Sequence, residues 1–479
     1  MVISILIILC CFFGVIILIL AGKNRAVSSL FGALIVYFVL IYVENKDFII
    51  IIDLLFGTAQ DNYSNVHSLI LIISIMIIIQ ISSDAGLFQV LAISLVKLSK
   101  GKPLYLMTIF CIVCLILATV LNNVLSIIIL IPLTITVSRI LNVDPSPYIL
   151  TQAVLVNLGA TMFSISSIPN VLITIYAGIS FIDFLLNVGV VSLITFGFSI
   201  PLFLVLYRKE IKIKKEDFEI LKEFDTKNFI QNKGLLIQSV IALLSLMTLF
   251  IILPSTFIPP DIIALSIALT LIIVSKLNPR EIISKIDIEL ILYLLGIFII
   301  AGALESTGIL DSLGELILSI GGGLYTQIII VMWISAFLSS SIDNVPITQI
   351  LLPVISTMTL GFPIGVGNQL YYGLAIGANW GDNLTPLGDN IFVIQIAEKN
   401  KRPISFKKFF KLGFFTTIYQ LSIVTVYYTL VFQFFQGLII IITISVILLI
   451  VYAFIKLAPK KSTKKLISVF STIKNYIIK

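Results

Sequence analysis

The stretch Leu-Asn-Asn-Val at residues 121–124 has a counterpart in the second half of the chain, Ile-Asp-Asn-Val at residues 342–345. A proline follows each stretch at the same distance, Pro132 in the first case and Pro353 in the second. Both stretches place polar side chains within long apolar segments, where polar groups are costly unless they pair with one another or line a cavity. Their matching order predicts a duplicated membrane protein in which each half contains a hairpin with a polar tip.

The composition of the whole chain agrees with a membrane protein. Of the 479 residues, 59% are hydrophobic and only 11% are charged, whereas a soluble domain carries about 25% charged residues. A soluble fold of this length needs a polar surface that this sequence does not supply. The composition therefore excludes a soluble enzyme, a disordered chain and a secreted disulfide scaffold.

The positions of the cations predict how the chain crosses the membrane. A spanning helix needs about 20 apolar residues, and short cytoplasmic loops are rich in Lys and Arg. If residues 103–140 and 325–360 each enter and leave on one side, 30 of the 31 Lys and Arg residues fall on one face and only Lys46 on the other. We expect an all-α polytopic membrane protein with about 11 spanning helices plus two hairpins, its N-terminus outside and its C-terminus inside. Two complete spans joined by a tight turn would sort the charges equally well.

On this orientation the two halves are inverted repeats, because the first hairpin enters from inside and the second from outside. The net charge of +7 then marks the cytoplasmic face, and no nucleic-acid partner is expected. Inverted repeats with broken helices are typical of secondary transporters. The predicted divisions are residues 1–207 (first repeat, hairpin 103–140, broken span 148–178), 208–233 (cytoplasmic linker), 234–436 (second repeat, hairpin 325–360, broken span 369–397) and 437–479 (an extra span and a basic cytoplasmic tail).

Polar residues at the hairpin tips and in the two broken spans form the predicted substrate or ion site. Irregular backbone at this depth is tolerated only where it is buried in protein or lines water. Amide and carboxylate oxygens suit a small cation, and helix N-termini favour an anion. The candidate residues are Asn122, Asn123, Asn157, Thr161, Ser164, Asn170, Asp343, Asn344, Asn379, Asp382, Asn383, Thr385, Asp389 and Asn390.

The acidic candidates are concentrated in the second half, while their first-half counterparts are neutral. We hypothesise that the acidic half binds a coupling cation, Na⁺ or H⁺, and that the neutral half serves the substrate. The candidate Na⁺ ligands are Asp343, Asn344, Asp382 and Asp389. No other cofactor is expected. His67 is the only histidine, so we interpret it as structural and expect no histidine-based metal site.

At these motifs the sequence resembles the arsenite/antimonite permeases. The resemblance rests on residues 122–124 and 157–161 in the first half and on residues 343–346 and 383–388 in the second. NhaD-type Na⁺/H⁺ antiporters and melanosomal P-protein relatives belong to the same ion transporter superfamily, with citrate and dicarboxylate sodium symporters more distant. The similarity covers roughly residues 65–435. It implies two re-entrant hairpins, a scaffold and a transport domain, a homodimer, and ligands from the hairpin tips and the broken spans.

The sequence departs from the family pattern in several places. Asn122 stands where an acid is common, and residues 166–168 read Ser-Ser-Ile where Gly and Asp usually precede Pro-Asn. Asp382 and Asp389 stand where small residues are common, and the last span with its basic tail is additional.

We therefore expect a secondary active transporter of the plasma membrane, embedded in the lipid bilayer, that moves a small inorganic ion or small anion by alternating access. Arsenite-type efflux is the leading prediction, because arsenite is neutral at pH 7 and suits a half-site lined by Asn and Ser. An NhaD-type Na⁺/H⁺ antiporter is the alternative. A sodium-coupled dicarboxylate symporter ranks third, because no Lys or Arg lies within the apolar segments. A passive channel and an intramembrane enzyme are disfavoured, the latter because no HExxH or Asp-rich catalytic motif is present.

Overall fold

A computed structural model of the chain describes residues 2–59, 62–99, 103–208, 210, 230, 232–255, 257–363, 365–457, 472, 474 and 476–477. Within these residues the protein is helical and contains no strand, which confirms the all-α prediction. Most of the predicted linker at 208–233 and of the basic tail lies outside the described residues.

The helices of the first half begin with two long elements and end with a broken span followed by a long helix. They are α1 (Val2–Leu20), α2 (Arg25–Phe38) with the π-helical η1 (Val39–Val43), α3 (Ile49–Phe56), α4 (Ser64–Asp84), α5 (Leu87–Lys97), α6 (Pro103–Val120), α7 (Asn123–Ile140), α8 (Ser146–Ala160), α9 (Ile168–Tyr176), α10 (Phe181–Phe184), the π-helical η2 (Leu185–Gly189) and α11 (Val190–Tyr207).

The second half repeats this order of long and short elements and adds one helix at its end. Its helices are α13 (Lys233–Ile252), α14 (Pro260–Ser275), α15 (Pro279–Ser284), α16 (Ile288–Ser306), α17 (Ile309–Ser319), α18 (Gly323–Ser341), α19 (Asn344–Thr359), α20 (Asn368–Gly381), the 3₁₀ turns η4 (Asp382–Leu384) and η5 (Gly388–Asn390), α21 (Ile391–Lys399), α22 (Phe406–Phe432) and α23 (Phe434–Leu457).

Nine helices among the described residues are long and apolar enough to cross a membrane. Two of these nine are hairpin arms, α7 and α18. Of the remaining predicted spans, α14 and α23 are shorter apolar helices over their described parts, and two are the broken spans. The protein is therefore a multi-pass membrane protein.

Each hairpin turns within two residues. The α6–α7 turn contains Leu121 and Asn122, and the Asn122 side chain caps α7 by accepting a hydrogen bond of 2.8 Å from the Leu125 N–H. The α18–α19 turn contains Ile342 and Asp343, and Asp343 is the N-cap residue of α19. The bond at the first tip satisfies one of the four N–H groups at the start of α7 that have no intrahelical acceptor.

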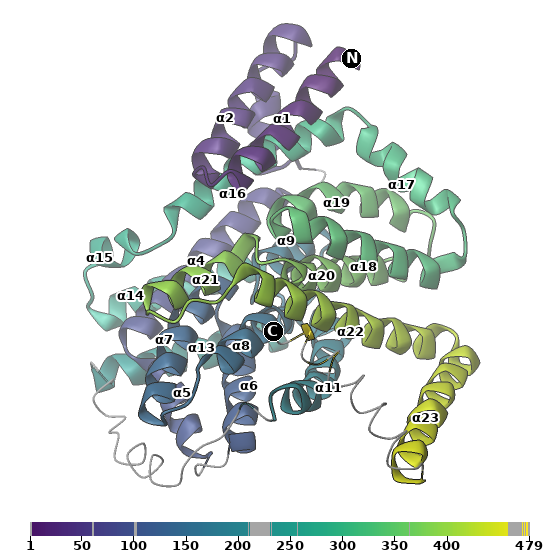
Figure 1. Ribbon diagram of the computed structural model, residues 1–479. Helices are drawn as coiled ribbons and strands as arrows, with labels where there is room; N and C mark the ends of the chain where they lie inside the picture. The colour runs from purple at the N-terminus through teal and green to yellow at the C-terminus, as the bar shows by residue number, and fades with distance from the viewer. Residues whose placement is uncertain are drawn as a thin grey trace.

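Helices of each half pack against helices of the other half. Helix α2 packs along α16 of the other half, and α14 packs along α4 in the equivalent way. Helix α9 contacts α19, and α21 contacts α7, so each broken span touches the hairpin of the opposite half. Figure 1 shows α2 beside α16 at the top and the yellow α23 standing apart at the lower right.

Candidate functional site

A cavity of about 230 Å³ lies between the two hairpin tips. Asn122 and Asn123 line it from the first hairpin, and Asp343 and Asn344 line it from the second. The tips of the two halves therefore face one shared cavity rather than two separate half-sites.

Five of the described helices begin at this cavity. They are α2, α7, α9, α16 and α19, and residues from the first turn of each line the cavity. The N-terminus of a helix carries a partial positive charge and backbone N–H groups without intrahelical acceptors. Their convergence makes the cavity suited to an anion.

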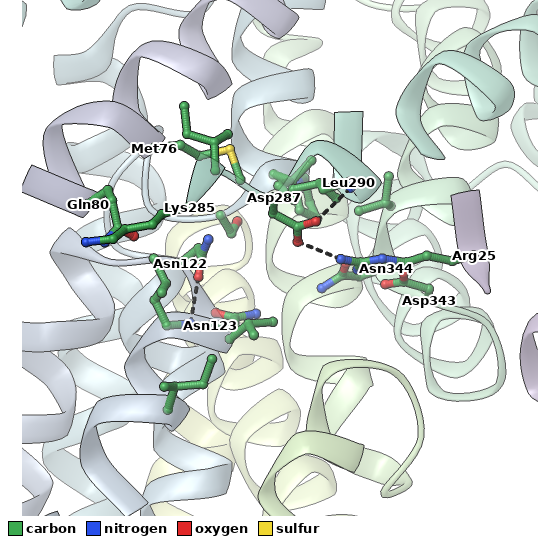
Figure 2. Close-up of a pocket in the computed structure, with 18 residues that line it drawn as sticks. Arg25, Met76, Gln80, Asn122, Asn123, Lys285, Asp287, Leu290, Asp343 and Asn344 are labelled. Carbon is green, nitrogen blue, oxygen red and sulfur yellow. Dashed lines mark hydrogen bonds and ion pairs between the residues drawn. The ribbon is translucent and has the colours of Figure 1, made fainter. Parts of the chain in front are cut away.

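The described lining contains two cations, of which the first is Arg25, at the start of α2. Its Nη2 donates to Asp287 Oδ2 at 2.8 Å, and its Nε lies 3.5 Å from Glu289 Oε1. Its side chain is only 20% exposed. Figure 2 shows Arg25 beside Asp343 and Asn344, with its guanidinium directed at Asp287.

The second cation is Lys285, which precedes α16. Its Nζ donates to Asp84 Oδ2 at 2.8 Å. Gln80 donates from Nε2 to the other oxygen of Asp84 at 3.0 Å. In Figure 2, Lys285 and Gln80 lie on the side of the cavity away from Arg25.

These two cations weaken one argument made from the sequence. A carboxylate substrate ranked third because the apolar segments contain neither Lys nor Arg, yet Arg25 and Lys285 lie just before such segments and line the cavity. Sequence reasoning read both as markers of the cytoplasmic face. The sequence signal for a role in binding is a pair of acids, Asp287 and Glu289, which follow Lys285 at the start of the span over residues 288–306.

The predicted residues of the broken spans form a buried network that joins the two halves. Asn157 Nδ2 donates to Asn383 Oδ1 at 2.7 Å, and Asn379 Nδ2 donates to Asn170 Oδ1 at 2.8 Å. All four side chains are fully buried. Each bond connects a first-half residue with a second-half residue, so the network holds the two broken spans against each other.

Further bonds extend this network. Trp380 Nε1 donates to Thr161 Oγ1 at 3.0 Å, and Asn390 Nδ2 donates to the backbone oxygen of Asp382 at 2.9 Å. Thr385 donates to the backbone oxygen of Ser340. None of these network residues is among those that line the tip cavity.

Several oxygen atoms of the network have no hydrogen-bond donor among the described residues. They are the amide oxygens of Asn157, Asn379 and Asn390. Asn157 and Asn390 also direct their amide nitrogens to within 3.4 Å and 3.2 Å of Asp382 Oδ2. Buried oxygens without donors beside a carboxylate are a suitable environment for a small cation.

Two predicted residues lie elsewhere. Ser164 lines a different cavity, next to His67 and Asp261. The backbone of Asp389 belongs to η5, but its side chain is outside the part of the chain that the structure describes. In the described residues no group of three or more His, Cys, Asp or Glu side chains could hold a metal ion.

The protein is a duplicated helical membrane protein with facing hairpins, broken spans and a central polar cavity. This is the architecture of secondary transporters. The sequence model of the citrate transporter family matches residues 15–377. The chain therefore belongs to the citrate transporter family, within the ion transporter superfamily that the motifs resemble.

Similar proteins agree with this assignment. The chain is 28% identical to a 46 kDa membrane protein of Mycobacterium leprae over 362 residues, which cover 74% of this chain and 84% of that protein. It is 28% identical to an uncharacterised transporter of Mycobacterium tuberculosis over 365 residues, with the same coverage. It is 25% identical to the P protein of Sus scrofa over 429 residues, which cover 73% of this chain and 51% of that protein. The protein is thus a membrane transporter and not an enzyme.

Proposed function

We propose that this chain is a secondary active transporter of a small carboxylate anion, which binds in the cavity between the hairpin tips. The observation that carries the proposal is the convergence of five helix N-termini with Arg25 and Lys285 around that cavity. A cavity of about 230 Å³ is smaller than a typical drug-binding pocket, which favours a compact solute. The description of the matched family as a citrate transporter supports the same class.

Bound carboxylate groups compete with the acids that hold the two cations in this structure. Arg25 already pairs with Asp287, and Lys285 pairs with Asp84. A solute with two or more carboxylates can take the place of both acids as partner of the cations. Asp287 and Asp84 then need a proton or a coupling cation before the cavity closes, because a buried carboxylate without a partner is costly. The fork of Arg25 suits a carboxylate in particular, because it donates two parallel hydrogen bonds.

The arsenite prediction remains open to the same experiment. Neutral arsenite would use the Asn and Ser side chains of the cavity, and Asn122, Asn123 and Ser167 do line it. The helix N-termini and the two cations favour an anion over a neutral solute. We therefore rank the carboxylate first and arsenite second.

The coupling cation is assigned to the acidic residues of the second half. Asp343 lines the tip cavity, and Asp382 lies beside the unpaired amide oxygens of the network. We expect Asp343→Asn, Asp382→Asn and Asp389→Asn each to alter the Na⁺ or pH dependence of flux. If all three leave both dependences unchanged, this assignment is wrong. By the family resemblance we also expect a homodimer in the plasma membrane.

Uptake into liposomes that contain the purified protein tests the proposed function. Labelled citrate, succinate and arsenite are each offered under an imposed pH or Na⁺ gradient. We expect uphill uptake of a carboxylate. Uptake of arsenite alone, or of Na⁺ with no solute requirement, would contradict the proposal, and flux that never exceeds equilibrium would indicate a channel.

A set of variants tests the role of Arg25 in binding. We expect Arg25→Gln to raise the half-saturating carboxylate concentration about tenfold or more, because a hydrogen bond to a charged group contributes about 1.5–3 kcal/mol. Arg280→Gln is the matched control, since Arg280 is an exposed cation on α15 outside the cavity. If Arg25 merely neutralises Asp287 and Glu289, the triple variant Arg25→Gln/Asp287→Asn/Glu289→Gln will recover native uptake. If Arg25 binds the solute, the triple variant will remain impaired.

A further inference from the structure

A second large cavity, of about 440 Å³, lies among α4, α9, α13 and α14. It is lined by the first turns of α4 and α14 and by the last turn of α9. On the charge-derived orientation these helix ends are on the outer face, opposite the lysine-rich side. We call this space the outer cavity.

A buried carboxylate faces the outer cavity. Asp261, in the first turn of α14, is 0% exposed, and its Oδ2 lies 2.9 Å from Nδ1 of His67 in the first turn of α4. Neither oxygen of Asp261 has another hydrogen-bond donor among the described residues. A carboxylate taken out of water without a full set of partners is costly, so the charge state of His67 decides the cost of burying this pair.

His67 connects Asp261 to water, because its side chain is 32% exposed. With a neutral imidazole the pair has a charge of −1. One proton from water on the outer face, bound at Nε2 while Nδ1–H donates to Asp261, brings the pair to zero. Enclosing the pair away from water is therefore cheaper when this proton is bound.

No other charged group of the described lining compensates this pair. The remaining lining residues from α9, α13 and the connecting segments are neutral, including Ser164, Thr174 and Ser255. The nearby acid on α10, Asp183, accepts a hydrogen bond from Ser180 and does not line the cavity.

The broken span separates the outer cavity from the tip cavity. Ile165 lines the outer cavity and also a small space of about 30 Å³ behind it. That space shares Asn122, Ser167 and Ile168 with the tip cavity. The irregular segment between α8 and α9 is thus the partition between the two cavities, and it is the element whose movement would enclose the His67–Asp261 pair.

We propose that the His67–Asp261 pair is a proton-binding site on the outer face, and that binding of the proton favours closure of the outer cavity. The linkage is reciprocal, so closure of the cavity also retains the proton. The site would make the equilibrium between outward-open and outward-closed forms depend on the external pH, whatever solute the tip cavity carries.

Cysteine accessibility tests this proposal without a transported solute, so its result is independent of the proposed function. Thr174→Cys places a thiol in the outer cavity of the full-length protein in liposomes, in a background with Cys10→Ser and Cys11→Ser. Labelling by a membrane-impermeant maleimide is compared at pH 5.5 and pH 7.5. Without its carboxylate the pair is neutral even when no proton is bound, so we expect Asp261→Asn to lower labelling relative to the native pair at pH 7.5 and to leave it nearly unchanged at pH 5.5. The ratio of variant to native labelling should therefore differ about tenfold between the two pH values. Comparing variants at one pH removes the pH dependence of the thiol itself.

Asp183→Asn is the matched control, an exposed acid near the same face, and it should label like the native pair at both pH values. The ring of the single histidine provides an independent measurement, because ¹⁵N-histidine labelling gives one residue to follow. The ring signals of His67 in the native protein should change over the same pH range as the labelling rate. Equal pH dependence in the native protein, Asp261→Asn and His67→Gln, or a ring that titrates over a different range from the labelling, would overturn the proposal.

Discussion

Asn157 is the residue at which the two halves depend most visibly on each other. Its amide donates to Asn383 across the halves, and it lies in a site with no exposed surface. A buried donor or acceptor that loses its partner costs about 1–3 kcal/mol. A few amide hydrogen bonds therefore contribute much of the free energy that holds the two broken spans together.

Asn157→Ala should lower the free energy of unfolding by about 1–3 kcal/mol, since Asn383 loses a donor and the removed side chain leaves a cavity. The melting temperature of the purified protein in one detergent measures this effect. Asn400→Ala is the control, because Asn400 donates only within its own helix, to the Ile396 oxygen. An equal shift for both variants would show that the cross-half bond contributes nothing specific.

At the residue scale the sequence predicted part of the site. The hairpin tips were predictable because polar side chains within apolar segments are rare and conspicuous. Arg25 and Lys285 were not, because a cation at the end of a span has the same sequence pattern whether it lines a cavity or only marks the cytoplasmic face. The pairing of Asn157 with Asn383 depends on how two distant spans cross, which no local pattern contains.

At the scale of helices, two glycines at equivalent positions allow a hairpin arm to approach a broken span closely. A Cβ atom added at Gly381 of α20 would lie 2.2 Å from the Ala336 oxygen of α18. A Cβ atom added at Gly159 of α8 would lie 2.8 Å from the Ala118 Cβ of α6. Small residues at helix contacts are a general device of membrane proteins, and here they occur in both halves.

Gly381→Ala should force α18 and α20 apart and destabilise the protein by about 1–3 kcal/mol, because the obstructing atoms belong to the backbone. Gly197→Ala in α11 is the control, since nothing lies within 4 Å of its added Cβ atom. It should be neutral or slightly stabilising, because Ala has the higher helix propensity. Thermal unfolding of both variants in one detergent distinguishes them, and equal unfolding temperatures would contradict the close-packing interpretation.

The long helices were predictable from apolar runs, whereas the short helices α3, α5, α15 and α17 were not assigned from the sequence. Helices α5 and α17 follow Gly86 and Gly308, which both have positive φ. Each contains both polar and apolar residues, so a hydropathy profile does not identify it as a span. The sequence match of residues 85–87 with residues 307–309 marks their equivalent places, but it does not show that a helix follows each glycine.

At the scale of the whole molecule, α23 is peripheral. It packs on α22 and on no other described helix to a comparable extent, and most of its described side chains are exposed. Figure 1 shows it extending away from the remaining helices. In contrast, α22 contacts α8, α11, α18 and α20.

A chain ending after residue 432 should therefore keep its fold and its transport activity, whereas a chain ending after residue 405 should not fold. Size-exclusion profiles of the two purified proteins and uptake into liposomes measure both outcomes. Loss of uptake in the longer chain, with its profile unchanged, would give α23 a functional role that its packing does not suggest.

The architecture as a whole was the most predictable feature, because hydropathy, charge sorting and the repeated motifs are distributed over the entire chain. The substrate was the least predictable, because it depends on a few side chains brought together from α2, α7, α16 and α19.

The central claim is that the transported solute occupies the cavity between the hairpin tips. Val124 lines this cavity in the first turn of α7, so the alkylation rate of Val124→Cys, in the background with Cys10→Ser and Cys11→Ser, reports on occupancy directly. We predict that the transported carboxylate slows this alkylation in proportion to its saturation of uptake, while an uncharged analogue leaves the rate unchanged. A carboxylate that is transported by the Val124→Cys protein but does not slow its alkylation would contradict the account.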